Sequence, residues 1–220
     1  MLSIEELNVS NIKVYQQDDL YHFTSDAVLL AKFTSVKKND VVADFCSGSG
    51  VVGFYLYGLS PEIKSVDFFE MQPTLYELSK KSIELNGLDQ KFTAHNIKVQ
   101  EVNKLFNEKF SLIVCNPPYM KTDSGLMDER EHIAMCKNEV YLPLKELIFS
   151  VSRSLKFGGR VNMVHRADRL IEVVYEMKKN NIEPKKLQFV SGGNKEPYLF
   201  LIEGVKGGKS GIKILSSIKN

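Results

Sequence analysis

Short runs of β-branched and aromatic residues alternate with helical patterns through the middle of this chain, and this alternation limits the fold more than any other feature. The runs that indicate strands are 40–46, 64–70, 92–95, 111–115 and 160–165. Apolar residues at helical spacing predict helices over 50–57, 73–86, 141–157 and 167–180. Because parallel strands need long crossover connections, which helices usually provide, the pattern predicts a doubly wound α/β sheet.

The last two strand-like runs, 186–191 and 198–204, have only a short turn between them. Such a turn favours a hairpin, which places one antiparallel strand in an otherwise parallel sheet of seven strands. We therefore expect one domain over residues 1–204, in which residues 1–39 form a hairpin and helix ahead of the sheet. Residues 205–220 contain no acidic residue and form a basic tail whose composition allows it to be mobile.

The composition is that of an ordinary soluble protein, with 43% hydrophobic and 25% charged residues in a chain of 220. No run of about 18 apolar residues is present, so we expect no membrane segment. Three cysteines without metal-like spacing favour a reducing, cytoplasmic location and give no reason to expect a metal. A net charge of +2 neither requires nor excludes a nucleic-acid partner.

A glycine-rich bend follows the first strand of the alternating region and indicates a ligand site. The segment Asp44-Phe45-Cys46-Ser47-Gly48-Ser49-Gly50 allows a sharp turn and close approach of a ligand. A tight turn without a ligand is the alternative. Asp44 would repel the pyrophosphate of a dinucleotide but would attract the ammonium and sulfonium groups of S-adenosylmethionine. The expected cofactor contacts here are Asp44, Ser47, Gly48 and Gly50.

Two further strand ends extend this predicted cofactor site. Glu70 closes the second strand about twenty residues after the glycine bend, where an acid can accept both ribose hydroxyls. We expect Met71 to lie beside it. Asn96 follows the third strand and is positioned to bind the adenine amino group. A solvent-exposed charge at Glu70 and a simple turn residue at Asn96 are the alternatives.

The most specific motif is Asn116-Pro117-Pro118-Tyr119, directly after the fourth strand. The Asn116 side-chain oxygen and the Pro117 carbonyl can accept both hydrogens of a planar NH2 group. Such acceptors aim the nitrogen lone pair at a sulfonium methyl group and stabilise the positive charge that develops on nitrogen. Tyr119 can stack on a planar substrate. Pro118 stiffens the segment. We predict that all four residues are catalytic and that Asn116 also contacts the cofactor.

Cys46 and Cys115 raise the alternative of a cysteine nucleophile of the kind that acts on cytosine. Both follow or end buried strands, a position typical of small apolar side chains. The sequence therefore favours direct transfer to nitrogen without a covalent enzyme intermediate.

These residues resemble class I S-adenosylmethionine-dependent methyltransferases of the Asn-Pro-Pro-Tyr type, over roughly residues 40–204. The segment 19–30, Arg130-Glu131-His132-Ile133, His165-Arg166 and the tail 203–209 resemble bacterial tRNA1(Val) (adenine-37-N6)-methyltransferases more specifically. This resemblance implies a Rossmann-like fold and contacts to the cofactor from Phe23, Thr24 and Asp26. Many relatives carry Asp where this chain has Asn96, a change that keeps the acceptor but removes the charge.

The resemblance implies an RNA substrate, a tRNA anticodon loop, and a monomer or weak homodimer. The expected substrate-binding residues are Tyr119, Arg130, His132 and Arg166. The tail carries Lys206, Lys209, Lys213 and Lys219, which can contact phosphates or merely keep the tail soluble. An adenine in a loop would be splayed out of its stack to reach Tyr119.

Three other functions remain open at this point, besides a DNA adenine methyltransferase, for which the sequence shows no target-recognition domain. The first is methylation of a glutamine amide in a protein release factor, which uses the same four-residue motif. Enzymes of that kind have a helical domain before the glycine bend, whereas only about forty residues precede the bend here. Methylation of a guanine amino group in ribosomal RNA is the second. A non-catalytic binding module of the same fold is the third, and the intact motif Asn116 to Tyr119 argues against it.

Overall fold

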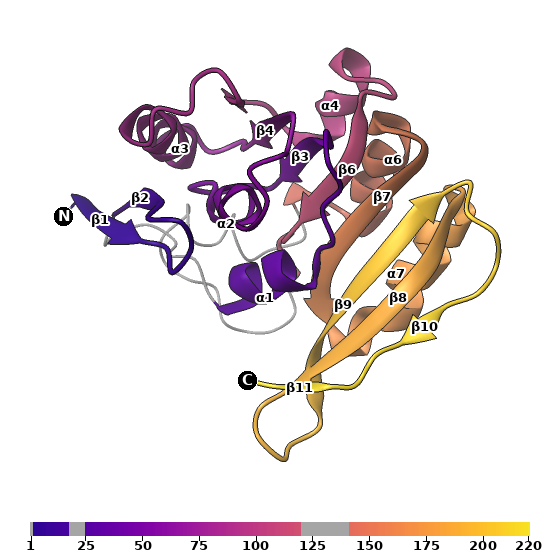
Figure 1. Cartoon of the computed structure of the whole chain (residues 1–220). Helices are drawn as coiled ribbons and strands as arrows, with labels where there is room; N and C mark the ends of the chain where they lie inside the picture. Colours follow the sequence, from indigo (N-terminus) through magenta and orange to yellow (C-terminus); the bar gives the residue numbers. More distant parts are fainter. Residues whose placement is uncertain (1, 18–24, 120–140) are drawn as a thin grey trace.

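A computed structural model describes residues 2–17, 25–119 and 141–220, and its centre is one large mixed sheet (Figure 1). The main strands are β3 (Val41–Phe45), β4 (Ser65–Phe69), β5 (Phe92–His95), β6 (Phe110–Cys115), β7 (Leu155–Arg166), β8 (Ile182–Ser191) and β9 (Pro197–Lys206). Their spatial order is β8-β9-β7-β6-β3-β4-β5, and only β9 runs antiparallel to its neighbours. The predicted mostly parallel sheet with one antiparallel strand is confirmed.

The strand order reverses between β3 and β6. From β3 the chain adds β4 and β5 on one side, and then returns to place β6 and β7 on the other. In open α/β sheets ligands bind beyond the carboxyl ends of the strands at such a switch point. The fold therefore predicts a ligand site at the residues that end β3 and follow β6.

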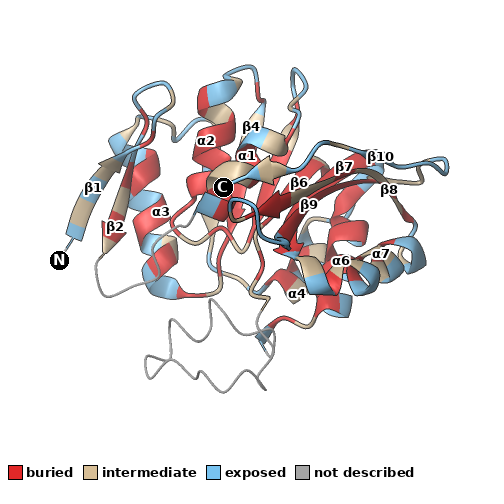
Figure 2. Ribbon diagram, turned by 90° about the horizontal axis from the view of Figure 1, so that it is seen from below, coloured by how far each residue is buried: buried red, intermediate tan, exposed pale blue. Residues whose placement is uncertain are grey.

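Helices cover both faces of the sheet (Figure 1). One face packs against α1 (Ser25–Phe33) and α2 (Val51–Leu59), and the end of α3 (Pro73–Leu85) joins the same apolar cluster. The other face packs against α4 (Val99–Leu105), α6 (Leu144–Ser154) and α7 (Leu170–Lys179), which follows a 3-10 turn, η3 (Ala167–Arg169). Buried residues therefore line both faces of the strands in the middle of the sheet, as parallel strands require (Figure 2).

Local sequence signals explain where several elements begin and end. Pro73 occupies the first turn of α3, where a missing N–H is harmless, and Gly87 at φ +62° follows the helix end. Gly50 precedes α2 with φ +88°, a conformation that side chains rarely adopt. The glycine bend thus shapes the turn from β3 into α2.

Several elements differ from the sequence expectation; among them, β8 begins at Ile182 rather than at 186, and α7 begins at Leu170 rather than at 167. The helix predicted over 141–157 is shorter, since α6 spans only Leu144–Ser154 and β7 already begins at Leu155. Leu155 pairs with Phe110 of β6, so strand pairing ends the helix three residues before the Gly158-Gly159 stop that the sequence offered. Helix α4 was not anticipated, because only Val99 and Val102 of its seven residues are buried.

The N-terminal hairpin lies against the helices rather than in the main sheet. It consists of β1 (Leu2–Glu6) and β2 (Lys13–Gln17), which pair antiparallel. The backbone N–H of Tyr15 donates to the Ser82 hydroxyl, and the Asn86 carboxamide both accepts from and donates to the Lys13 backbone. Leu7, Ile12 and Val14 join the core around α2.

Residues 207–220, here called the C-terminal strap, follow the outer edge of β8. Two short strands in it, β10 (Lys213–Ile214) and β11 (Ile218–Lys219), pair parallel with β8. Composition allowed this basic tail to be mobile, whereas the structure ties it to the sheet edge because β8 offers unpaired backbone groups there. No helix in the described ranges is long and apolar enough to cross a membrane.

Candidate active site

The strand order brings the two main predicted motifs together. Phe45 at the end of β3 pairs with Cys115 at the end of β6, so the glycine bend and Asn116 leave the sheet side by side. Asp44 lies one residue earlier, opposite Val114. About 70 residues of sequence separate these motifs, and only the β3–β6 pairing makes them neighbours.

Asp44 is fully buried and only partly satisfied. One carboxylate oxygen accepts the Gly53 backbone N–H at 2.9 Å. The other oxygen, Oδ1, has no hydrogen-bond partner among the described residues, and neither does the nearby Ser47 hydroxyl. Burial raises the pKa of Asp44 to about 7, although the Gly53 N–H opposes the shift. A buried carboxyl group with an unused oxygen can bind a cationic ligand.

Gly50 and Gly53 are required by packing on Phe68 of β4. A Cβ at Gly50 would lie 2.8 Å from the Phe68 ring, and a Cβ at Gly53 would lie 2.4 Å from it. Helix α2 therefore sits directly on β4, with Phe54 and Phe68 in edge contact at 5.0 Å. This close packing fixes the position of the glycine bend above the strand ends.

Glu70 connects the glycine bend to the start of α3. Its two carboxylate oxygens accept the backbone N–H of Gly48 at 2.9 Å and of Gln72 at 2.8 Å. Burial raises the pKa of Glu70, and backbone N–H donors, including that of Met71, limit the rise. The side-chain nitrogen of Asn96 donates to the carbonyls of Glu70 and Met71 at 2.9 and 3.1 Å. Asn96 thereby keeps its oxygen available as an acceptor.

The segment after β6 carries the predicted catalytic residues. Asn116 is half-buried, and in the described part of the chain its carboxamide makes no hydrogen bond. Pro117 is buried and Pro118 is half-buried. The Tyr119 hydroxyl donates to Oδ2 of Asp26 in α1 at 2.7 Å, and the Tyr119 ring lies 5.7 Å from the ring of His165. Tyr119 is thus held between α1 and the end of β7.

Other predicted site residues are either not described or engaged elsewhere. Phe23, Thr24, Arg130 and His132 lie outside the described residues. Arg166 is at the carboxyl end of β7 as expected, but its guanidinium forms a two-bond ion pair with Asp168, at 3.1 and 2.7 Å. Arg166 is therefore not an uncompensated cation.

Sequence reasoning missed Gln16, which reaches the glycine bend from β2. Gln16 is 1% exposed, and its side-chain nitrogen donates to the Ser49 hydroxyl at 2.7 Å. Its position on the inward face of β2, two residues after buried Val14, is the signal that was available. The N-terminal hairpin thus contacts the glycine bend directly.

The two cysteines beside the bend do not resemble activated nucleophiles. Cys115 is buried at the end of β6, and Cys46 follows β3 at φ +59°. Hydrogen bonding to the Cys115 thiol, together with burial, raises the pKa of Cys46 well above its ordinary value. Within the described ranges, no group of His, Cys, Asp and Glu side chains could hold a metal ion.

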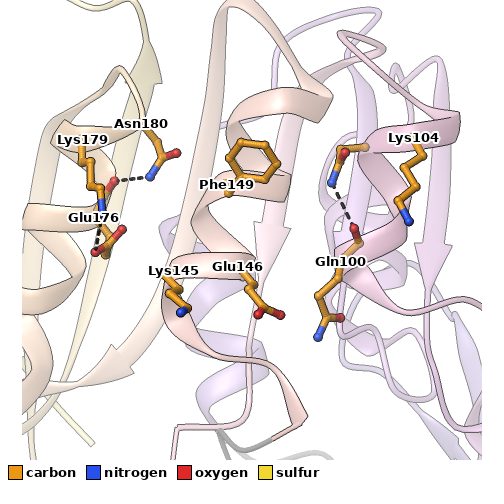
Figure 3. A pocket seen from close by; sticks show the side chains of 9 residues that line it. Gln100, Lys104, Lys145, Glu146, Phe149, Glu176, Lys179 and Asn180 are labelled. Carbon is orange, nitrogen blue, oxygen red and sulfur yellow. Dashed lines mark hydrogen bonds and ion pairs between the residues drawn. The ribbon is translucent and has the colours of Figure 1, made fainter.

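A separate cavity of about 460 Å³ lies between α4, α6 and α7 (Figure 3). Phe149 forms its wall, and Lys104, Lys145, Glu146 and Glu176 surround it. None of the predicted site residues lines this cavity. The motifs at the β3–β6 switch point and this hollow on the helical face are therefore distinct features.

Comparison with known proteins agrees with this geometry. The family model described as methyltransferase small domain matches residues 13–180. A Christiangramia forsetii protein named tRNA1(Val) (adenine(37)-N6)-methyltransferase is 26% identical over 176 residues, which cover 79% of this chain and 72% of that protein. The match to the same-named Porphyromonas gingivalis protein covers 59% of that protein's length.

Solved structures show the same fold at low identity. An Agrobacterium tumefaciens protein described as a predicted O-methyltransferase superposes with a TM-score of 0.69 and 18% identity, covering 88% of this chain and 86% of that one. The M. jannaschii protein TYW2, solved in complex with AdoMet, gives a TM-score of 0.65 and 14% identity, with 92% and 84% covered. At these identities the likeness supports the Rossmann-like methyltransferase fold.

Proposed function

This chain belongs to the methyltransferase small domain family, and on that premise we propose that it transfers the methyl group of S-adenosylmethionine to the exocyclic N6 of an adenine in RNA, with tRNA as the preferred class. Methyl transfer as such follows from family membership. The site chemistry supports the cofactor and the acceptor nitrogen, and the names of the tRNA-methylating relatives support the RNA.

One observation carries the proposal. Asn116 follows β6 at the switch point with a carboxamide that makes no hydrogen bond in the described part of the chain, beside a bend whose Asp44 has an unused buried oxygen. A free amide acceptor next to an unsatisfied anion suits a neutral NH2 group on one side and a cationic cofactor on the other.

The residues of the bend fit S-adenosylmethionine. Asp44 Oδ1 and the Ser47 hydroxyl are buried polar atoms without partners in the described chain, and both can bind the ammonium end of the cofactor. Glu70 keeps acceptor capacity for a ribose hydroxyl, because a carboxylate has about four acceptor positions and the backbone N–H groups of Gly48, Met71 and Gln72 do not occupy all of them. The Asn96 oxygen can accept the adenine amino group. When bound, the cofactor supplies an electrophilic methyl group.

On the substrate side, Asn116 and the Pro117 carbonyl accept the two hydrogens of the adenine amino group. This arrangement directs the nitrogen lone pair toward the cofactor and lowers the cost of the positive charge that develops on nitrogen. Tyr119, with His165 behind it and Phe200 stacked on His165 at 6.2 Å, offers an aromatic surface for a planar base. The Asp26–Tyr119 hydrogen bond holds the phenol in place.

Methylation of purified RNA tests the proposal directly. The full chain is incubated with S-adenosylmethionine labelled in the methyl group and with unmodified tRNA and ribosomal RNA in parallel. Nucleoside mass spectrometry after digestion then identifies the product, and a reaction with Asn116→Ala serves as the control. We expect labelled N6-methyladenosine from tRNA and none with the variant.

The same experiment separates the alternatives. Labelled N2-methylguanosine from ribosomal RNA would overturn the adenine assignment. Labelled methylglutamine in a release factor added to the reaction, with unlabelled RNA, would overturn the RNA assignment. If Asn116→Ala forms as much product as the unaltered chain, the role given to the carboxamide is wrong.

A further inference from the structure

The C-terminal strap runs along β8 to the edge of the sheet that carries the active site. Lys213 pairs with Lys186 in the middle of β8, and Lys219 pairs with Ser191, the last residue of that strand. Because β8 is parallel to β6, its carboxyl end lies at the same edge as Asn116. The strap thus ends beside the substrate side of the molecule, where Figure 1 also draws the C-terminus close to α1.

A chain of hydrogen bonds connects the end of the strap to Tyr119. The Asn220 side-chain nitrogen donates to the Ser25 hydroxyl at 3.0 Å and to the Tyr198 hydroxyl at 2.9 Å. Ser25 is the first residue of α1 and contacts Asp26 at 3.5 Å, and Asp26 accepts the Tyr119 hydroxyl. The strap is therefore anchored next to the proposed base pocket.

The strap presents exposed positive charge, and Glu183, an acidic side chain that contacts the strap backbone at Gly211, is already paired with Lys178. Lys209, Lys213 and Lys219, here called the lysine row, are exposed, and the strap contains no acidic residue. Lys209 and Lys213 have no ion pair in the described chain, while Lys219 contacts only the neutral Asn194 carboxamide.

The carboxylates of the supporting strands are already paired. Glu203 of β9, 5% exposed, binds Lys186, and Glu183 of β8 binds Lys178. Lys206, which the sequence placed in the same tail, instead binds Glu108 and the Leu155 carbonyl. The lysine row of the strap therefore remains available for an external anion.

We propose that the C-terminal strap is the surface on which the phosphate backbone of the RNA docks while one base enters the pocket beside Tyr119. This inference rests on the proposed function, because RNA is the polyanion that it supplies. A row of lysines fixed on a sheet edge, rather than on a free tail, holds the RNA in a defined register relative to the pocket. The lysine row contributes affinity for RNA but does not distinguish one base sequence from another.

The test compares two triple variants of the full chain with equal loss of charge. Lys209→Gln, Lys213→Gln and Lys219→Gln remove the lysine row. Lys64→Gln, Lys80→Gln and Lys81→Gln form the control. Lys64 directly precedes β4, and Lys80 and Lys81 lie on α3, so these exposed lysines are beyond β3 in the strand order, away from β8. Affinity for unmodified tRNA is measured by fluorescence anisotropy at several salt concentrations, and melting temperatures check that both variants fold.

For the lysine-row variant we expect about tenfold weaker tRNA binding and a salt slope reduced by about 2, as phosphate contacts are lost. Its KM for tRNA should rise while kcat at saturating tRNA and cofactor affinity stay unchanged, and the control should match the unaltered chain. Equal tRNA affinity in the two variants would overturn the inference even if N6-methyladenosine forms. Conversely, weaker tRNA binding by the lysine-row variant with no methylated adenine in any RNA would retain the docking surface and refute the proposed function.

Discussion

At the scale of single residues, the site separates into an anionic half and an acceptor half. Asp44 and Glu70 are buried carboxyl groups that backbone N–H groups hold in place. Asn116, by contrast, has no partner in the described chain. The anionic half is thus preorganised by backbone contacts, and the Asn116 carboxamide is left available for the proposed substrate.

Replacing Asn116 by Ala should separate catalysis from cofactor binding. The variant loses an acceptor needed mainly when positive charge develops on nitrogen, so we expect kcat to fall about 100- to 1,000-fold. Calorimetry should find the affinity for S-adenosylmethionine nearly unchanged. Asn103→Ala, which removes a carboxamide in α4 at the separate cavity, is the matched control and should retain activity.

Asp44 should make cofactor binding depend on pH near neutrality. Because burial raises the pKa of Asp44 to about 7, the carboxyl group of the free protein is increasingly protonated below that pH. A cationic ligand needs the ionised form, so its affinity should fall by up to about tenfold per pH unit below pH 7 and level off above it. Calorimetry between pH 5.5 and 8.5, about 1.5 pH units on either side of the pKa of Asp44, measures this dependence.

Two variants test whether Asp44 itself causes the pH dependence of cofactor binding. Asp44→Asn should bind the cofactor weakly with little pH dependence in this range, whereas Asp89→Asn, an exposed change on the surface, should behave like the unaltered chain. The stability of the free protein should depend on pH in the opposite direction to its affinity for the cofactor. A raised carboxyl pKa stabilises the free protein at low pH, and this contribution is lost as the pH rises toward 7. A cofactor affinity independent of pH would contradict the role of Asp44.

At the scale of elements, contacts between segments hold the glycine bend in position. Helix α2 packs on β4 through Gly50 and Gly53, and strand β2 reaches the bend through the Gln16–Ser49 hydrogen bond. The N-terminal hairpin therefore does more than cover the core. It supports the loop that is expected to bind the cofactor.

Changing Gln16 to Ala should weaken both the hairpin and the bend. The Ser49 hydroxyl, 6% exposed, would lose its buried donor, which costs about 1–3 kcal/mol in unfolding free energy. We expect the affinity for S-adenosylmethionine to fall by about three- to tenfold, because the bend becomes less well ordered. Urea unfolding and calorimetry measure the two effects. Gln90→Ala, an exposed change, should alter neither, and an unchanged cofactor affinity in Gln16→Ala would leave the hairpin with a structural role only.

At the scale of the whole molecule, a buried ionic network joins the segment between α1 and β3 to strands β6 and β7. Arg160 of β7 binds Asp40 at 2.6 Å and also donates to the Ser35 carbonyl. Asp40 in turn accepts the Lys37 backbone N–H at 2.7 Å and the Ser111 hydroxyl at 2.7 Å. Both side chains of the ion pair are less than one tenth exposed.

Breaking this network from one side should be costly. Arg160→Met leaves the Asp40 carboxylate buried and unpaired, and we expect the free energy of unfolding to fall by about 3–5 kcal/mol. The double variant with Asp40→Asn should be less destabilised than the sum of the two single variants, because the buried charge is removed as well. Additive effects in urea unfolding would show that the two groups are energetically independent.

The sequence by itself determined the order of strands and helices and the chemical nature of the motifs. Periodicity and turn residues are local, so β3 to β6, α2 and α3 could be predicted to within a few residues. β7 begins five residues earlier than predicted, and α4, with only two buried positions, could not be predicted. Likewise Asp44, Glu70 and Asn116 could be selected because each directly follows or ends an apolar run.

Only the tertiary structure decided which of these segments meet. The β3–β6 pairing places Asp44 beside Asn116, and hydrogen bonds join Gln16 to Ser49 and Asp26 to Tyr119 across long stretches of chain. The same holds for the strap, whose two-residue strands have no periodicity to detect and are held by the unpaired edge of β8. Such contacts depend on burial and on free backbone groups in distant segments, and a local sequence pattern predicts neither.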